Sequence, residues 1–170
     1  MRLQTRQVVM AGLLGAIAII LGTTNLGFIP LPTLAGRATI MHIPAIIAGI
    51  MEGPIVGFFV GLIFGFVSFA QGNSFFVDPV IAIIPRALIG VIAYLAYRWL
   101  KNKPWLATMM AAVLGTLTNT VGVLSLAVLR GYIPTWSAAG VIVLTHGLPE
   151  VIVAVILVIL VVKALKSFER

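Results

Sequence analysis

The chain has 170 residues, of which 61% are hydrophobic and only 9% are charged. Soluble globular domains carry about 25% charged residues, so this chain cannot cover a water-facing surface and most of its exterior must face lipid. The composition excludes a disordered protein, a collagen-like fibre and a basic nucleic-acid-binding domain. Because there are no cysteines, disulfides and thiolate metal sites are excluded as well. We therefore predict a polytopic membrane protein.

Apolar stretches separated by turn signals define the expected helices. A helix that crosses a bilayer needs about 20 mainly apolar residues, and Pro, Gly and short polar clusters mark its ends. The first stretch begins like a signal peptide but lacks a small-x-small cleavage site, so we expect it to be retained. The second is short for a complete crossing, and residues 23–39 before it form a loop. The predicted helices cover residues 7–22, 40–51, 55–70, 79–99, 105–129 and 136–162.

The basic residues predict the orientation of this bundle. With six crossings both termini lie on one side, where eight basic residues gather, against only Arg37 and Arg130 on the other. Cytoplasmic loops carry the excess of Lys and Arg, so both termini are expected to be cytoplasmic, with Glu52 in a solvent-exposed cytoplasmic turn. The net charge of +7 is then a matter of topology and does not indicate a nucleic-acid partner. The expected fold is all-α, with residues 1–170 forming a single transmembrane domain.

Three common catalytic motifs are absent from the sequence. There is no phosphate-binding loop for ATP hydrolysis, no H-E-x-x-H and no G-x-S-x-G. The longest predicted loop, residues 23–39, has no room for a soluble catalytic domain. His42 and His146 lie far apart, and a metal site needs further ligands. We expect a binding or transport protein without enzymatic activity, cofactor or metal.

Small residues recur at helical spacing in two of the predicted helices. A glycine occupies every fourth position from Gly53 to Gly65, which allows another helix to approach closely and indicates packing inside the bundle. The first helix repeats the pattern towards its cytoplasmic end. There, internal packing and docking onto a partner membrane subunit are both open. The candidate docking residues are Ala11, Gly12, Gly15 and Ala16.

Polar groups inside the predicted spans need a reason to be there, because a charge at mid-bilayer costs about 2.5 to 3.5 kcal/mol. Arg86 and Glu150 either neutralise each other between helices or line a polar cavity that opens outward. His146 shares a helical face with Glu150, and Asn119 makes either an interhelical hydrogen bond or a ligand contact. The candidate ligand-binding residues of the outer half are Asn25, Arg37, His42, Asn73, Asp78, Arg86, Asn119, Arg130, His146 and Glu150.

Two segments resemble a known family. The stretch from His42 to Gly49, continuing to Gly65, and the stretch from Gly115 to Val121 are similar to the substrate-binding S components of energy-coupling factor (ECF) vitamin transporters, in the riboflavin and pantothenate branch. The resemblance implies a subunit of the bacterial cytoplasmic membrane that binds a vitamin at its outer face, under the first loop. It also implies partners, namely a transmembrane T component, which docks on small residues of the first helix, and two ABC-type ATPases. In this family the S component is thought to topple in the membrane.

Alternatives remain open for both the substrate and the class of function. Three arginines of the outer half suit a carboxylate or phosphate, which favours pantothenate, while the few outer-half aromatic residues make riboflavin or a pyridoxine- or pyrimidine-type vitamin second. A self-contained proton-coupled carrier would use Glu150 or Asp78 as its titrating group. A purely structural membrane subunit would bind no small molecule.

Overall fold

The computed structural model describes residues 4–30, 37–72 and 74–168. This part of the chain is helical apart from two three-residue strands, β1 (Phe28–Pro30) and β2 (Arg37–Thr39). Short 3-10 turns, η1 (Asn25–Gly27) and η2 (Ser74–Val77), and a π-helical segment, η3 (Val143–Gly147), complete it. The α-helices are α1 (Thr5–Thr23), α2 (Ile43–Glu52), α3 (Pro54–Gln71), α4 (Pro79–Trp99), α5 (Pro104–Leu129), α6 (Trp136–Ile142) and α7 (Leu148–Phe168).

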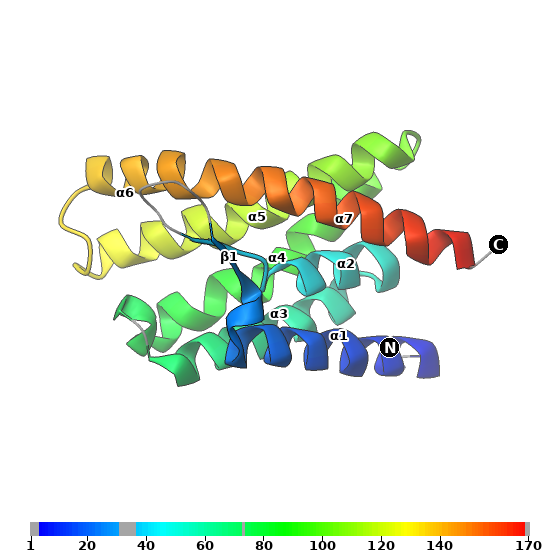
Figure 1. The fold of residues 1–170 in the computed structure, drawn as a ribbon, viewed down its shortest axis with the longest axis horizontal. Helices are drawn as coiled ribbons and strands as arrows, with labels where there is room; N and C mark the ends of the chain where they lie inside the picture. The colour runs from blue at the N-terminus through cyan, green and yellow to red at the C-terminus, as the bar shows by residue number, and fades with distance from the viewer. Residues whose placement is uncertain (1–3, 31–36, 73, 169–170) are drawn as a thin grey trace.

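Within the described ranges, five helices are long and apolar enough to cross a membrane, if α6, η3 and α7 are taken as the one continuous helix that they form. The shorter α2 is a sixth apolar helix, with only ten residues. The prediction of a helical fold with apolar helices of membrane-spanning length is therefore confirmed. Figure 1 shows both termini at one end of the bundle, which we call the terminal end and which also holds the α4–α5 turn. The opposite end holds η2 and the α5–α6 turn.

Proline and aspartate determine where the long helices begin. α3, α4 and α5 each start at a proline, whose fixed φ suits the first helical position and whose missing N–H has no intrahelical acceptor there. Asp78 precedes α4, and its carboxylate accepts a hydrogen bond from the backbone N–H of Val80 at 2.9 Å. This is the usual way in which a helix cap satisfies a free N–H group.

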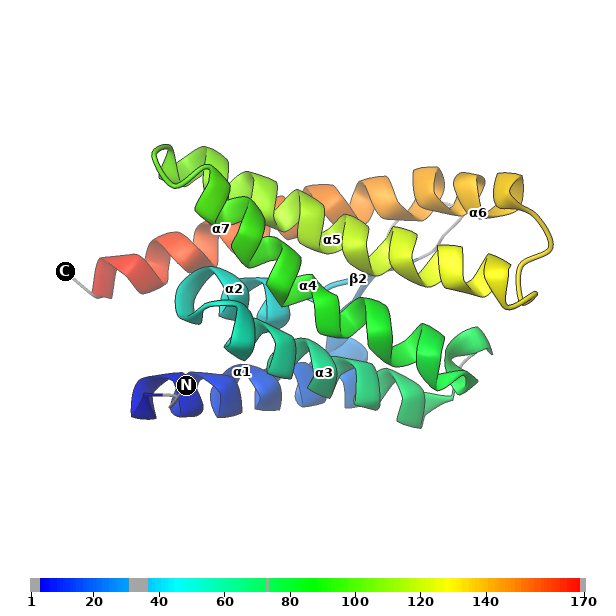
Figure 2. The same cartoon turned by 180° about the vertical axis from the view of Figure 1, so that it is seen from behind.

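The centre of the bundle is α4, which packs against α3 on one side and α5 on the other (Figure 2). The contact with α3 is so close that a Cβ atom on Gly90 would lie 2.4 Å from the Cα of Gly57. Gly61 and Gly65 face the α4 backbone in the same way, whereas Gly53 forms the α2–α3 turn with a φ of 98°. The glycines within α3 therefore serve packing inside the bundle.

Helix α1 lies at the edge of the bundle and packs on α3 and α2 (Figure 1). Gly15 is buried against the side chain of Ile63, and Ala11 is partly buried against the core. Gly12 and Ala16 face outward, and no atom lies within 4 Å of the position that a Cβ would take on Gly12. Ala11 and Gly15 thus face the bundle, whereas Gly12 and Ala16 face away from it.

The expected exposure of Glu52 is wrong. Its side chain is only 5% exposed, and its carboxylate accepts a hydrogen bond from Arg6 Nε at 3.0 Å. Gln7 also donates to the Glu52 carbonyl at 3.0 Å. The start of α1 covers the end of α2, and this long-range contact has no signal in the local sequence.

Candidate ligand-binding site

A short β-hairpin lies between the helices at the middle of the molecule (Figure 1). β1 and β2 pair antiparallel, with Phe28 opposite Thr39, and Ile40 N–H donates to the Gly27 carbonyl at 2.9 Å. The sequence predicts only a loop here, because three-residue strands leave no readable alternation. The hairpin brings the backbone of Thr39 towards α7.

Glu150 of α7 connects this hairpin to two helices. Its Oε1 accepts hydrogen bonds from the backbone N–H of Thr39 and from His146 Nε2, both at 2.9 Å, and its Oε2 accepts one from the Thr120 hydroxyl at 3.0 Å. The carboxylate is buried, and His146 is partly exposed. Such a carboxylate is satisfied on both oxygens, as a buried charge must be.

The irregular helix before Glu150 has a local cause. Pro149 has no N–H to donate to the preceding turn, so the α-helical pattern cannot continue unchanged through it. The π-helical segment η3 contains His146 and ends at Gly147, two residues before Pro149. A π-helical turn contains more residues than an α-helical turn, so it rotates the helix that follows relative to the helix that precedes it.

His42 lies just before α2 and is completely buried. Its Nε2 is 3.0 Å from the Thr116 hydroxyl, and that hydroxyl donates its only hydrogen to the Ala112 carbonyl at 2.8 Å. The hydroxyl must therefore accept from His42, which places the proton of a neutral imidazole on Nε2. In the described part of the structure His42 Nδ1 has no partner, so it is a free buried acceptor.

Arg86 lies in the middle of α4 and is 3% exposed. Its Nη1 donates to the carbonyls of Ile81 and Ala82, at 2.9 and 3.1 Å. Pro85 removes the N–H that would otherwise bond the Ile81 carbonyl, so the arginine satisfies a carbonyl that the proline leaves open. The guanidinium carbon is 4.2 Å from the centre of the Phe76 ring and 5.2 Å from that of Phe64. Among the described residues Arg86 Nε has no partner.

Asn119 of α5 adds a third buried polar atom, since its Oδ1 has no hydrogen-bond partner among the described residues. It lies between Thr116, which contacts His42, and Thr120, which contacts Glu150. His42, Arg86 and Glu150 are within electrostatic range of one another. We call His42, Arg86, Asn119, His146 and Glu150 the central polar cluster.

The direct ion pair between Arg86 and Glu150 is not formed within the described residues. Glu150 pairs instead with His146, and Arg86 bonds to backbone carbonyls. The remaining candidates lie elsewhere: Asp78 and Arg130 form an ion pair of 3.4 Å between the start of α4 and the end of α5. Asp78 precedes Arg86 by eight residues, about 12 Å along a helix. Asn73 and the side chains of Asn25 and Arg37 lie outside what the structure describes.

Some contacts of the cluster were not predicted. The backbone of Thr39 and the hydroxyl of Thr120 bind Glu150, and Phe64 flanks Arg86. Thr116 and Thr120 are four residues apart on α5, a spacing that puts two hydroxyls on one helical face. That spacing is the only signal for Thr120, and nothing local marks Thr39 or Phe64.

Comparison with known proteins gives the family. Residues 6–162 match the family model described as ECF transporter, substrate-specific component. The chain belongs to this family. Its predicted role as a vitamin-uptake subunit and its membrane location are thereby confirmed.

Two curated relatives carry a substrate in their names. The pantothenic acid transporter PanT of Lactococcus lactis subsp. cremoris is 37% identical over 154 residues, covering 76% of this chain and 78% of the relative. The pantothenate transporter PanT of Leuconostoc mesenteroides subsp. mesenteroides is 35% identical over 119 residues, covering 61% and 58%.

A solved structure has the same fold. It is described as "Structure and mechanism of the S component of a bacterial ECF transporter" and matches with a TM-score of 0.67 at 20% identity, covering 98% of this chain and 99% of that one. This ECF S component thus has the fold of a solved S component.

Proposed function

We propose that this S component binds pantothenate and delivers it to an ECF complex in which a T component and two ABC-type ATPases supply the energy. The chain then acts as one transmembrane unit with six crossings and both termini in the cytoplasm. The vitamin is captured from the outside and lies in the central polar cluster, beneath the β-hairpin. No covalent chemistry is involved.

The observation that carries this proposal is the state of Arg86. Its guanidinium is buried, and in the described part of the chain no carboxylate lies within ion-pair distance. Burying a cation without an ion-pair partner is costly, and a carboxylate ligand lowers that cost with strong charge-assisted hydrogen bonds. Pantothenate carries one carboxylate, and the substrate in the names of both curated relatives agrees with it.

The other atoms of the cluster that lack a partner match the hydrogen-bond donors of pantothenate. His42 Nδ1 and Asn119 Oδ1 are acceptors without a partner among the described residues, and pantothenate has two hydroxyls and one amide N–H to donate. A site built to bond such groups discriminates against ligands that lack them, because its own polar atoms would stay unpaired.

A calorimetric titration tests the role of the carboxylate. The purified protein should bind pantothenate without ATP, and should bind its alcohol analogue, which has a hydroxymethyl group in place of the carboxylate, roughly 30-fold more weakly, the equivalent of about 2 kcal/mol. Arg86→Met should abolish this preference. Arg98→Met, the same change on the same helix at an exposed position, should keep it. Equal binding of both compounds by the wild-type protein would remove pantothenate from the proposal.

Transport assays separate the S component from a proton-coupled carrier. In liposomes with a pH gradient the chain alone should not accumulate pantothenate, while the complex with the T component and ATPases should do so only with ATP. Both carboxylates that the carrier would need are engaged, Glu150 by three donors and Asp78 by the α4 cap and Arg130. Proton-driven uptake by the chain alone would contradict the proposal.

The orientation has its own test. Because the chain has no cysteine, Lys103→Cys and Tyr132→Cys each introduce a unique label site, at the terminal and the opposite end. A membrane-impermeant thiol reagent added to intact cells should modify Tyr132→Cys, and Lys103→Cys only after permeabilisation. The reverse pattern would place the termini outside.

A further inference from the structure

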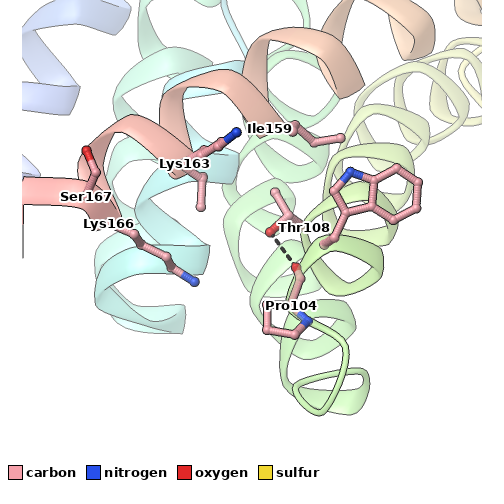
Figure 3. Close-up of a pocket in the computed structure, with 8 residues that line it drawn as sticks. Pro104, Thr108, Ile159, Lys163, Lys166 and Ser167 are labelled. Carbon is pink, nitrogen blue, oxygen red and sulfur yellow. Dashed lines mark hydrogen bonds between the residues drawn. The ribbon is translucent and has the colours of Figure 1, made fainter. Parts of the chain in front are cut away.

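A groove between α5 and α7 at the terminal end lies apart from the central polar cluster. It has a volume of about 430 Å³. Figure 3 shows Pro104 and Thr108 on the α5 side and Ile159, Lys163, Lys166 and Ser167 on the α7 side. Trp105 and Val162 complete its lining. Lys163 is 13 residues beyond Glu150, about 20 Å along a helix, so the groove is well separated from the proposed vitamin site.

Positive charge dominates the polar groups that the groove offers to a ligand. The Thr108 hydroxyl donates to the Pro104 carbonyl, and the Ser167 hydroxyl donates to the Ala164 carbonyl. The Lys166 ammonium is held by Tyr97 of α4, through a hydrogen bond to the hydroxyl and a position 4.7 Å from the ring centre. Lys163 is exposed and has no ion-pair or hydrogen-bond partner in the part of the chain that the structure describes. The groove thus presents one engaged and one free ammonium group above an apolar wall.

The surroundings do not neutralise this charge. Among the described residues at the terminal end the acidic side chain is Glu52, which is already paired with Arg6. The tryptophans Trp99 and Trp105 are 82% and 66% exposed there, as expected of side chains at headgroup depth. The basic residues described at this end are Arg6, Arg98, Lys101, Lys103, Lys163 and Lys166.

We propose that this groove binds one anionic phospholipid, with the phosphate at Lys163 and an acyl chain along Trp105 and Ile159. A basic pocket between transmembrane helices at the membrane surface is the arrangement that recognises anionic headgroups. The ligand needs a negative group to pair with the ammonium group and an apolar group to cover the apolar wall. A lipid with a negative headgroup has both, because its acyl chains are apolar. Bound in this way, the lipid joins the start of α5 to the end of α7.

Native mass spectrometry of the full-length protein, titrated with single lipids, tests this proposal. Phosphatidylglycerol should bind more tightly than phosphatidylcholine, and Lys163→Gln should weaken phosphatidylglycerol roughly fivefold but weaken phosphatidylcholine, whose choline already offsets the phosphate charge, much less. Lys101→Gln removes the same charge at the same end but outside the groove, and should have no such effect. Ile159→Trp fills the apolar wall without changing any charge, and should weaken both lipids.

Several outcomes would overturn the proposal. An equal effect of Lys101→Gln would show diffuse surface attraction, and free glycerol 3-phosphate binding as tightly as the lipid would make the ligand a soluble phosphate. The groove would belong to a protein partner if Lys163→Gln prevented assembly of the ECF complex in bilayers made of phosphatidylcholine alone. Equal affinity of the wild-type protein for the two lipids would also reject it.

Discussion

The backbone N–H of Thr39 donates a hydrogen bond of 2.9 Å to the carboxylate of Glu150, a residue 111 positions later in the chain. A non-helical segment among membrane helices has N–H groups that lipid cannot satisfy. Glu150 satisfies one of them, and holds the end of the hairpin against α7. The same carboxylate binds Thr120 of α5, so that one side chain fixes the position of three elements around the proposed vitamin site.

Removing this carboxylate should release the hairpin. Glu150→Leu leaves the Thr39 N–H, the Thr120 hydroxyl and His146 without their acceptor, and we expect it to lower the free energy of unfolding by about 3 kcal/mol. Glu150→Gln keeps an acceptor for Thr39 and should cost less than half as much. Thermal unfolding in detergent measures the stability, and hydrogen exchange at the Thr39 amide measures the anchoring. Unchanged protection of that amide in Glu150→Leu would show that the contact does not hold the hairpin.

The two buried charges should behave largely independently in a double mutant, because they share no hydrogen-bond partner among the described residues. Arg86 bonds to the Ile81 and Ala82 carbonyls, whereas Glu150 bonds to Thr39, Thr120 and His146. Because the two charges still lie within electrostatic range of each other, the loss of stability in the double mutant should be somewhat less than the sum of the losses in Arg86→Met and Glu150→Leu, with most of each loss retained. Denaturation of the two single mutants and the double mutant decides this. Recovery of stability in the double mutant would mean that the two charges mainly neutralise each other.

The outward-facing small residues of α1 separate docking from folding. Gly12→Leu and Ala16→Leu point away from the bundle, so they should leave pantothenate binding unchanged but abolish uptake by the assembled complex, because a bulky side chain blocks close helix approach. Gly15→Leu should also destabilise the isolated protein, since even a Cβ there would lie 2.7 Å from the Ile63 side chain.

A matched control exists for these α1 variants. Gly140 of α6 is exposed, with no atom within 4 Å of a Cβ added there, and Gly140→Leu should support normal uptake. Full uptake by both Gly12→Leu and Ala16→Leu would exclude this face as the docking surface for the T component.

The contact between α3 and α4 should tolerate no side chain. A methyl group on Gly90 would lie within 2.5 Å of several backbone atoms of Gly57, and backbone cannot move aside as a flexible side chain can. Gly90→Ala is expected to lower the free energy of unfolding by about 3 kcal/mol or more. Gly12→Ala, at an open helical position, should instead raise it slightly through helix propensity. Similar unfolding midpoints for the two variants would contradict the close packing.

Hydropathy, proline and basic residues predict most of the helical fold because each acts locally. Pro79 marks the start of α4, and the end at Trp99 is marked by the polar turn that follows. The exposure of Glu52 could not be read in this way, since its burial depends on Arg6, 46 residues earlier. The hairpin was missed for a similar reason, because its strands are too short to show a pattern and are held by a distant side chain.

In the candidate site, too, local features could be predicted from the sequence and contacts between distant residues could not. His146 and Glu150 share a helical face by spacing alone, and the structure places them 2.9 Å apart. Whether Arg86 meets Glu150 depends on how α4 and α7 are rotated, and the proline beside each of them, Pro85 and Pro149, alters the local helix. The sequence therefore indicates which charged residues belong to the site, but their partners depend on how the helices are rotated.

The length of α2 has a consequence for how the protein enters the membrane. Ten residues extend about 15 Å, half the thickness of the hydrocarbon core, so α2 is too short to be inserted by its own hydrophobicity. If only the five helices of membrane-spanning length crossed the bilayer, the two termini would lie on opposite sides of it. Both termini nevertheless lie at the same end of the bundle (Figure 1). In the proposed topology of six crossings, α2 is the sixth, and it is held by tertiary packing in which Gly49 of α2 meets the Gly90 carbonyl of α4. We therefore expect α2 to insert fully only after α4 has been synthesised, so that the topology of the first half of the chain depends on folding.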